Sequence, residues 1–276
     1  MTGERALVLG GGGVTGIAWE TGILHGLAAA GVDLSRADLF VGTSAGSVVA
    51  AEVAGGGVLA DLYAGQLLPP EAEIPARLTP WMVARYALSY VMPGSAAAKR
   101  ARLGRAALKA STPSEESRLA VFDSRLSIKD WPARALKVTA VDAVSGKFVA
   151  FDRSSGVPLV SAVAASCAVP LVWPPVTVNG SRYMDGGMRS VANVDLAAGY
   201  ERVVVVAPLT RAASAAASPG AQAARLGVPS IVVSPDRAAL AAIGPNLLDP
   251  ARRRAAAEAG FAQAASVVGA VREVWG

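Results

Sequence analysis

Short apolar runs alternate with helical patterns over the first 55 residues of the chain. Residues 6–9 form an apolar run that predicts a strand, and glycines occupy positions 10–13 directly after it. Residues 16–30 place apolar side chains at helical spacing. A second apolar run at 39–41 leads into a Val- and Ala-rich helix near residue 47. This strand–helix order predicts a parallel sheet covered by helices on both faces.

Residues 60–131 have a different pattern. Prolines recur there together with several aromatic side chains and a basic stretch, so we predict a helical insertion or lid over the sheet. The apolar and aromatic residues in it that are candidates to line an acyl groove are Trp81, Met82, Tyr86, Tyr90 and Met92.

Strand patterns return after the insertion. Apolar runs at 136–141, 148–151, 203–207 and 230–233 predict strands. The uncharged stretches 154–181 and 212–224 are interpreted as strands with turns and as a surface loop, respectively. A C-terminal helix is expected over 249–276, with Asp249 as its cap and Pro250 in the first turn. We therefore expect one domain over residues 1–276, a three-layer α/β/α fold with a mostly parallel central sheet.

Composition and charge narrow the functional classes. Apolar residues make up 53% of the chain and charged residues 17%, which excludes a disordered protein. The net charge of +5 comes from one stretch, 95–114, which has five basic residues and no acid. This stretch is either a solvated helix face or a patch for anionic lipid headgroups. No aromatic residue interleaves with the charges, so a nucleic-acid surface is not expected. The five residues are Lys99, Arg100, Arg102, Arg105 and Lys109.

The supply of metal ligands and of cysteine is small. Cys167 is the only cysteine and His25 the only histidine, so neither a disulfide within the chain nor a zinc site is expected. The first residues lack the pattern of a signal peptide, and prolines interrupt the longest uncharged stretch. We expect a cytoplasmic protein that can lie peripherally at the inner membrane surface, without a metal or cofactor.

The strongest local motif is Gly42-Thr43-Ser44-Ala45-Gly46, a G-x-S-x-G between a predicted strand and a predicted helix. Side chains two positions either side of the serine would clash in so sharp a turn, whereas Gly42 and Gly46 let the backbone pass. The turn then presents the Ser44 hydroxyl at the end of the sheet. A small-residue turn without chemistry has the same local pattern, but the strand–helix context favours a nucleophile.

A serine nucleophile needs a base. His25 precedes Ser44 on the first predicted helix, so the chain order of an α/β-hydrolase triad is absent. The best carboxylate is Asp185, which Gly186 and Gly187 follow. Asp-Gly pairs are also common in simple turns. As a base, Asp185 would need partial burial to raise its pKa.

The glycine-rich segment from Gly10 to Gly16 has two interpretations. Its backbone amides can form an oxyanion hole at the start of a helix. The spacing from Gly11 to Gly16 also fits the G-x-G-x-x-G fingerprint of dinucleotide-binding proteins, with Asp33 or Asp38 as the acid that follows.

Together the three motifs resemble the patatin-like phospholipases, which use a Ser–Asp dyad. The segment 165–175, just before Asp185, is also similar to that family. The resemblance implies that Ser44 attacks an acyl ester, that Asp185 is the general base, and that amides of Gly11, Gly12, Gly13 and Ala45 hold the oxyanion. It implies a lipid ester substrate and no cofactor.

One position differs from the residue that is usual in this family, and two alternative functions stay open. Family members usually carry Arg or Lys where this chain has Thr15, a difference that bears on headgroup preference. A catalytically weak, lipid-binding relative is therefore one alternative. A dinucleotide-binding oxidoreductase built on the segment from Gly11 to Gly16 is the other, although it leaves Ser44 and Asp185 unexplained.

Overall fold

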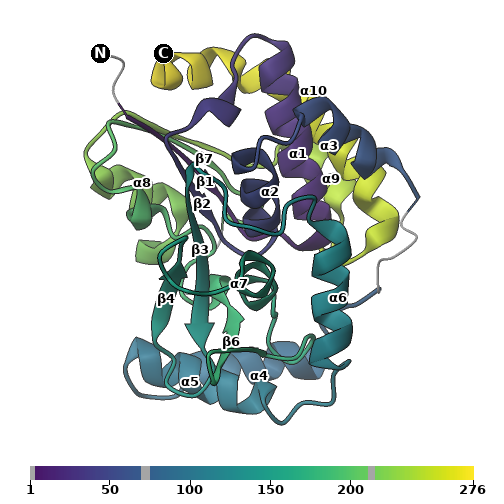
Figure 1. Cartoon of the computed structure of the whole chain (residues 1–276), viewed down its shortest axis with the longest axis vertical. Coiled ribbons are helices and arrows are strands. Elements are labelled where there is room, and N and C mark those ends of the chain that lie inside the picture. The colour runs from purple at the N-terminus through teal and green to yellow at the C-terminus, as the bar shows by residue number, and fades with distance from the viewer. Residues whose placement is uncertain (1–3, 70–74, 211–214) are drawn as a thin grey trace.

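The computed structural model describes residues 4–69, 75–210 and 215–276, and within them eight strands form one mixed sheet (Figure 1). Five strands run parallel in the order β3-β2-β1-β7-β8. Their bounds are β1 Arg5–Leu9, β2 Leu39–Gly42, β3 Ala135–Asp142, β7 Arg202–Val206 and β8 Ser230–Val233. The antiparallel strands are β4 Phe148–Phe151, β5 Val176–Val178 and β6 Ser181–Asp185. The predicted α/β fold with a mostly parallel sheet is confirmed.

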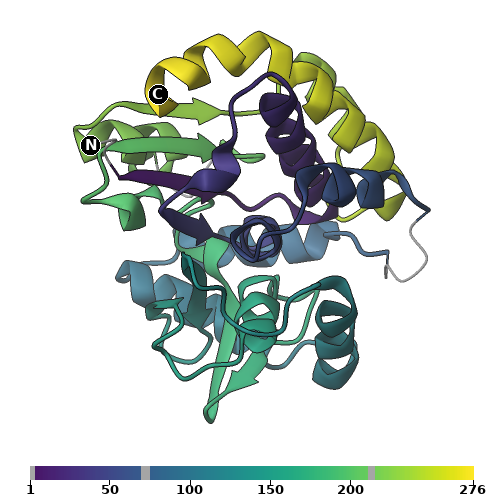
Figure 2. The ribbon, with the colours of Figure 1, turned by 45° about the horizontal axis from the view of Figure 1, so that its top comes forward.

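Helices cover the two faces of the sheet unequally (Figure 2). The larger core packs side chains such as Leu7 and Phe40 against the helices of one face. These are α1 Gly13–Ala29, α2 Ala45–Ala54, α7 Leu159–Ser166, α9 Arg237–Ile243 and α10 Arg253–Trp275. The smaller core packs Val8 and Val41 against a 3-10 turn, Val194–Ala197, and α8, Pro219–Leu226. Because β1 and β2 are buried on both faces, successive residues of each strand are apolar.

The helices of the insertion divide among three places. Their bounds are α3 Leu59–Leu67, α4 Pro80–Val91, α5 Ala96–Ala107 and α6 Glu115–Arg125. The α3 helix packs beside α1 and α10, whereas α6 packs beside α7. The α4 and α5 helices lie together at the opposite end of the molecule from α10, where α5 contacts β3 (Figure 1).

Two of the predicted loop-like segments contain helices, so those predictions were wrong in part. Within the uncharged stretch 154–181, α7 begins directly after Pro158 and ends at Ser166. The other prolines of the stretch, at positions 170, 174 and 175, follow the helix. Within the segment 212–224, α8 begins at Pro219, and the Ser218 side chain caps it. Residues 211–214 lie outside the described part of the chain. The expected C-terminal helix is present as α10, after a 3-10 turn that Asp249 caps.

The pairing of β3 positions the active-site candidates. Val138 pairs with Gly42 of β2 and, on its other edge, with β4. Ala140 pairs with Asp185 of β6 and, again on its other edge, with β4. A strand has only two edges, so β6 continues along the edge of β3 at which β2 ends. Asp185 is thereby placed just beyond the carboxyl end of β2, where Ser44 follows.

Candidate active site

Ser44 occupies a tight turn between β2 and α2. Its backbone φ is 52°, in the positive region that a serine rarely adopts, so the turn holds the residue under strain. The flanking glycines explain how the turn closes. A Cβ at Gly46 would meet the Leu9 carbonyl oxygen at 2.2 Å, and one at Gly42 would meet the Cα of Ser47 at 2.4 Å. The steric need for glycine that the motif indicated is therefore present in the structure.

The Ser44 and Asp185 side chains are in direct contact. Ser44 Oγ donates a hydrogen bond of 2.7 Å to Asp185 Oδ2. The Gly187 N–H donates to the other carboxylate oxygen at 2.7 Å, which fixes the plane of the carboxylate. The Ser44 N–H in turn donates to Ser166 Oγ at 2.9 Å. Both partners of the pair are thus oriented by a second hydrogen bond.

Burial tunes the carboxylate of this pair. Asp185 is only 3% exposed, and desolvation raises its pKa from 3.8 to about 6. The hydrogen bonds from Ser44 and Gly187 act in the opposite direction on the pKa. A carboxylate with a pKa near 6 is a stronger base than an exposed aspartate, yet it is ionised at neutral pH.

The predicted oxyanion hole needs one correction. The Gly11 N–H donates to the Val191 carbonyl at 2.7 Å, so its single hydrogen is already used. The amides of Gly12, Gly13 and Ala45 have no acceptor among the described residues. They lie at the N-termini of α1 and α2, where helix dipoles favour negative charge. Two helices begin beside Ser44, and N–H groups that lack an acceptor among the described residues come from both of them.

Gly10, Gly11 and Gly16 have a packing role. The Gly10 carbonyl accepts the Gly46 N–H at 2.9 Å, which ties the glycine-rich segment to the serine turn. A Cβ at Gly11 would lie 3.5 Å from the Cβ of Ser44, and one at Gly16 would lie 3.6 Å from the Cβ of Ala45. The segment therefore approaches the serine turn closely at both of its ends.

A mostly apolar cavity of about 530 Å³ opens beside Ser44 and Asp185. Leu78, Tyr86 and residues 245–248 contribute to its walls. Buried Thr15, at the position where the resembled family carries a basic residue, donates to the Leu247 carbonyl from both its N–H and its hydroxyl. Thr15 therefore fixes the position of Leu247 in the wall of the cavity.

A second, smaller cavity of about 40 Å³ also has Ser44 in its wall. Arg118, Phe122 and Arg125 of α6 line it at helical spacing, and the Arg118 guanidinium lies 3.7 Å from the centre of the Trp173 ring. Cys167 also lines this cavity, and burial raises the pKa of its thiol to about 12. With this pKa the thiol is protonated at neutral pH, so it is neither a base nor a good nucleophile.

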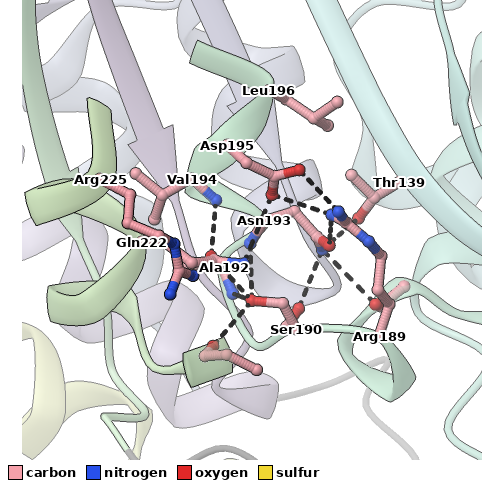
Figure 3. A network of polar contacts seen from close by, with 12 residues as sticks. Thr139, Arg189, Ser190, Ala192, Asn193, Val194, Asp195, Leu196, Gln222 and Arg225 are labelled. Carbon is pink, nitrogen blue, oxygen red and sulfur yellow. Dashed lines mark hydrogen bonds and ion pairs between the residues drawn. The ribbon is translucent and has the colours of Figure 1, made fainter. Parts of the chain in front are cut away.

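A buried polar network joins the segments next to Ser44 and Asp185, and Figure 3 shows the part of it around Asn193. Asn193, fully buried with φ of 51°, donates from Nδ2 to Thr43 Oγ1 at 3.0 Å and to the Ser190 carbonyl at 2.9 Å. Thr139 Oγ1 donates to Thr43 Oγ1 at 3.0 Å. A Cβ at Gly186 would meet Thr139 Oγ1 at 2.2 Å. The network therefore joins the residue before Ser44 to the turn after Asp185.

The network residues carry no local motif, and sequence reasoning missed them. Asn193 follows Asp185 within ten positions, but an isolated Asn is typical of any turn. The one usable signal was its place a few residues after Gly186 and Gly187. Ser166 lies in the stretch 165–175, and the sequence pattern there indicates no individual role for it.

The structure does not place an acidic residue where a dinucleotide site on the glycine-rich segment would need one. Asp38 lies beside Arg5, where its carboxylate accepts the Arg5 N–H at 2.7 Å, and Asp33 caps the 3-10 turn Leu34–Arg36. Both acids precede β2, whereas the glycine-rich segment follows β1. Since β1 and β2 are parallel, the acids and the glycines lie at opposite ends of these strands. His25 is likewise outside the site and stacks on Tyr63, with 5.0 Å between the ring centres.

Of the five groove candidates in the insertion, only Tyr86 lines the large cavity. Its hydroxyl donates to the Pro170 carbonyl at 3.0 Å, and the Tyr90 hydroxyl donates to the Met188 carbonyl at 2.8 Å. Trp81 is 57% exposed and Met92 43% exposed, so both lie on the outside of the molecule. No helix among the described residues has the length and apolar character needed to cross a bilayer. Nor do they contain a cluster of three or more His, Cys, Asp and Glu side chains that would suit a metal.

Comparisons with known proteins give the family. No curated protein matches the chain. Among solved structures, VipD from Legionella pneumophila is 13% identical with a TM-score of 0.48, and the match covers 98% of this chain and 67% of VipD. The type III effector protein ExoU is 15% identical with a TM-score of 0.44, over 100% of this chain and 54% of ExoU. The chain thus spans about half of the ExoU chain. The sequence profile of the patatin-like phospholipases matches residues 7–198, and the chain belongs to this family.

Proposed function

We propose that this protein is a lipid acyl hydrolase that cleaves carboxylic esters with Ser44 as nucleophile and Asp185 as general base. The hydrogen bond of 2.7 Å between Ser44 Oγ and Asp185 Oδ2 carries the proposal. It supplies the base that a serine needs, in a chain whose single histidine stacks on Tyr63 away from the site. Family membership supports the ester chemistry.

The reaction proceeds in two halves. Asp185 takes the Ser44 proton as Oγ attacks the ester carbonyl carbon, and amides of Gly12, Gly13 and Ala45 bind the oxyanion. The tetrahedral intermediate collapses, the C–O bond to the alcohol breaks, and Asp185 returns the proton to the leaving oxygen. Water then attacks the acyl-serine while Asp185 accepts its proton. The second tetrahedral intermediate collapses, the bond between the acyl carbon and Ser44 Oγ breaks, and Asp185 returns the proton to Oγ. The carboxylic acid then leaves, so the cycle needs no cofactor.

The substrate we propose is a lipid with at least one acyl ester, phospholipids included. The cavity of about 530 Å³ beside Ser44 is mostly apolar, as a site for an acyl chain should be. A cytoplasmic location, peripheral to the inner membrane, and contact of the basic stretch with anionic lipid remain part of the proposal. So does the assignment of residues 1–276 to one domain.

A fluorophosphonate probe, which phosphonylates activated serines, tests the proposal together with hydrolysis of a short-chain ester. The wild type should be labelled and active. Ser44→Ala should lose labelling, and both Ser44→Ala and Asp185→Asn should lose about 10³-fold or more in kcat/KM. Ser124→Ala and Asp123→Asn on the exposed side of α6 are matched controls that should behave as wild type.

Two outcomes would contradict the assignment. Wild-type activity in folded Asp185→Asn, judged by near-ultraviolet circular dichroism, would remove Asp185 from its role. A folded wild type with neither labelling nor hydrolysis would favour the catalytically weak, lipid-binding relative instead.

A further inference from the structure

The α4 helix touches the rest of the protein along one narrow stripe. Its buried or half-buried side chains are Met82, Tyr86, Ser89 and Tyr90, and the two tyrosine hydroxyls bind backbone carbonyls of the segments around Asp185. The rest of the helix surface faces solvent. Large apolar side chains are exposed there: Trp81 by 57%, Val83 by 54%, Leu88 by 50% and Val91 by 80%. A soluble surface rarely carries so many exposed apolar side chains on one helix.

The same region is strongly basic. Residues 75–114 contain seven Lys and Arg residues and no Asp or Glu. Two of the cations are engaged in the fold, since Arg100 donates to the Gly146 carbonyl and Arg102 to the carbonyls of Ser89 and Met92. Arg85, Arg105 and Lys109 form no ion pair with a described residue. Their positive charge is therefore not neutralised by a neighbouring carboxylate in the described part of the chain.

These cations meet in a groove between α4 and α5. The groove has a volume of about 250 Å³, and Arg85, Arg102, Arg105 and Lys109 line it together with Leu88 and Met92. Clustered guanidinium and ammonium groups bind phosphate through charge-assisted hydrogen bonds. The apolar side chains at its edge fit the acyl region just below a headgroup.

We propose that the α4–α5 groove binds the phosphate of an anionic lipid headgroup while the exposed face of α4 enters the surface of the bilayer. Charge complementarity selects a bilayer with anionic lipids over a neutral one. Trp81, Leu88 and Val91 lie in the boundary between headgroups and acyl chains. Long arginine and lysine side chains then reach up to the phosphates.

The docking surface is continuous with the proposed site of ester cleavage. Leu78, which is 45% exposed, lines the large cavity beside Ser44 and lies two residues before the start of α4. Tyr86 lies on the packed stripe of α4 and lines the same cavity. A lipid leaving the bilayer along α4 therefore meets apolar side chains as far as the cavity. This placement rests on the proposed hydrolase function, whereas binding to a bilayer does not.

Vesicle flotation of the full chain carrying Ser44→Ala tests the docking without turnover. The protein should bind vesicles of phosphatidylcholine with a minor fraction of phosphatidylglycerol, and bind pure phosphatidylcholine weakly. Neutralising Arg105 and Lys109 together to Gln should lower the partition coefficient by about fivefold per charge, since about 1 kcal/mol per cation corresponds to that factor. Trp81→Ser with Val91→Ser should also lower it. High salt should weaken the charge-dependent part.

Matched controls remove charge or apolar area elsewhere. Arg153→Gln with Arg237→Gln removes two exposed charges outside the groove, and Leu240→Ser changes a side chain that is 56% exposed on α9. Both should bind as the parent does. Equal binding by the Arg105/Lys109 variant, or no preference for anionic vesicles, would overturn the proposal. Displacement by soluble glycerol phosphate would instead indicate a small-anion site, and a dimer abolished by Trp81→Ser with Val91→Ser would indicate a second copy as the partner.

Discussion

The serine turn and the α4 helix are attached to the protein in opposite ways. Around Ser44 the backbones of β1, β2 and α2 approach so closely that added methyl groups would overlap main-chain atoms. The α4 helix instead rests on a stripe of four side chains and leaves its other faces exposed. The first region tolerates almost no change in shape, whereas the second tolerates changes in shape and is sensitive to its surface chemistry.

This difference assigns different tasks to the two regions. Hydrogen bonds aimed within a few tenths of an ångström hold a reactive pair, and they require rigid backbone around them. A surface that meets a fluid bilayer gains nothing from such precision and depends on apolar area and charge. Adding or removing a single atom should therefore disturb the serine turn, whereas α4 should be sensitive only to the combined effect of several side chains.

The same substitution should have opposite effects in the two kinds of environment. Gly46→Ala places a Cβ at 2.2 Å from the Leu9 carbonyl oxygen, so we expect a loss of about 3 kcal/mol or more in unfolding free energy. Gly65→Ala in α3 of the insertion meets nothing within 4 Å and should gain about 0.5 kcal/mol. Urea unfolding of both variants measures the contrast. A stable, fully active Gly46→Ala protein would contradict the close approach.

The pH dependence of hydrolysis should report the tight region alone. A carboxyl with its pKa raised to about 6 must be ionised to accept the Ser44 proton. The rate constant kcat/KM should therefore be level above pH 7 and fall about tenfold per pH unit below about pH 6. The measurement uses a water-soluble ester, so that membrane binding does not enter. A profile that stays level down to about pH 4 would show that burial does not raise this pKa.

Loss of the network behind the pair should cost less than a backbone clash. Asn193→Ala leaves the buried Thr43 and Thr139 hydroxyls with fewer partners, and we expect about 2 kcal/mol of destabilisation together with a lower kcat. Asn179→Ala is the matched control, because Asn179 has a similar φ of 47° but lies exposed in the β5–β6 turn. Backbone strain alone would affect both variants equally. Equal changes in stability would therefore remove the network from the explanation.

The smallest effect is expected on α4. Val91 is 80% exposed, so Val91→Ser should change the unfolding free energy by less than about 0.5 kcal/mol. Val53→Ser in α2, at a side chain 1% exposed, should cost about 2 kcal/mol or more. Thermal unfolding of the two variants compares the regions directly. A large loss of stability in Val91→Ser would mean that α4 packs more tightly than its exposure indicates.

Much of the candidate site could be predicted because its signals are local. The order strand, Gly-x-Ser-x-Gly, helix predicts a sharp turn whatever the rest of the chain does, and Ser44 lies in one. The two glycines after Asp185 likewise indicate a close backbone approach, and Gly186 faces Thr139. Continuous apolar runs were sufficient to predict the central parallel strands β1, β2 and β7, which are buried on both faces.

What was missed depends on partners far away in the chain. Gly11 cannot be separated from Gly12 by sequence, because the carbonyl that occupies its amide belongs to Val191. The meeting of Ser44 and Asp185 depends on the pairing of β3 with β6, which spacing does not reveal. The α8 helix was different, since its cap Ser218 and first-turn Pro219 were present but outweighed by the Ala- and Ser-rich composition.

The edge of β3 that pairs with both β2 and β6 sets the spacing between Ser44 and Asp185. Val138 sits opposite Gly42 and Ala140 opposite Asp185, so two steps of backbone on one strand measure out the distance between nucleophile and base. Side chains alternate between the faces of a strand, so one residue inserted or deleted at this point would turn the carboxylate to the wrong side without altering either catalytic candidate. The relative position of the two side chains is thus set by the register of the strands that pair with β3.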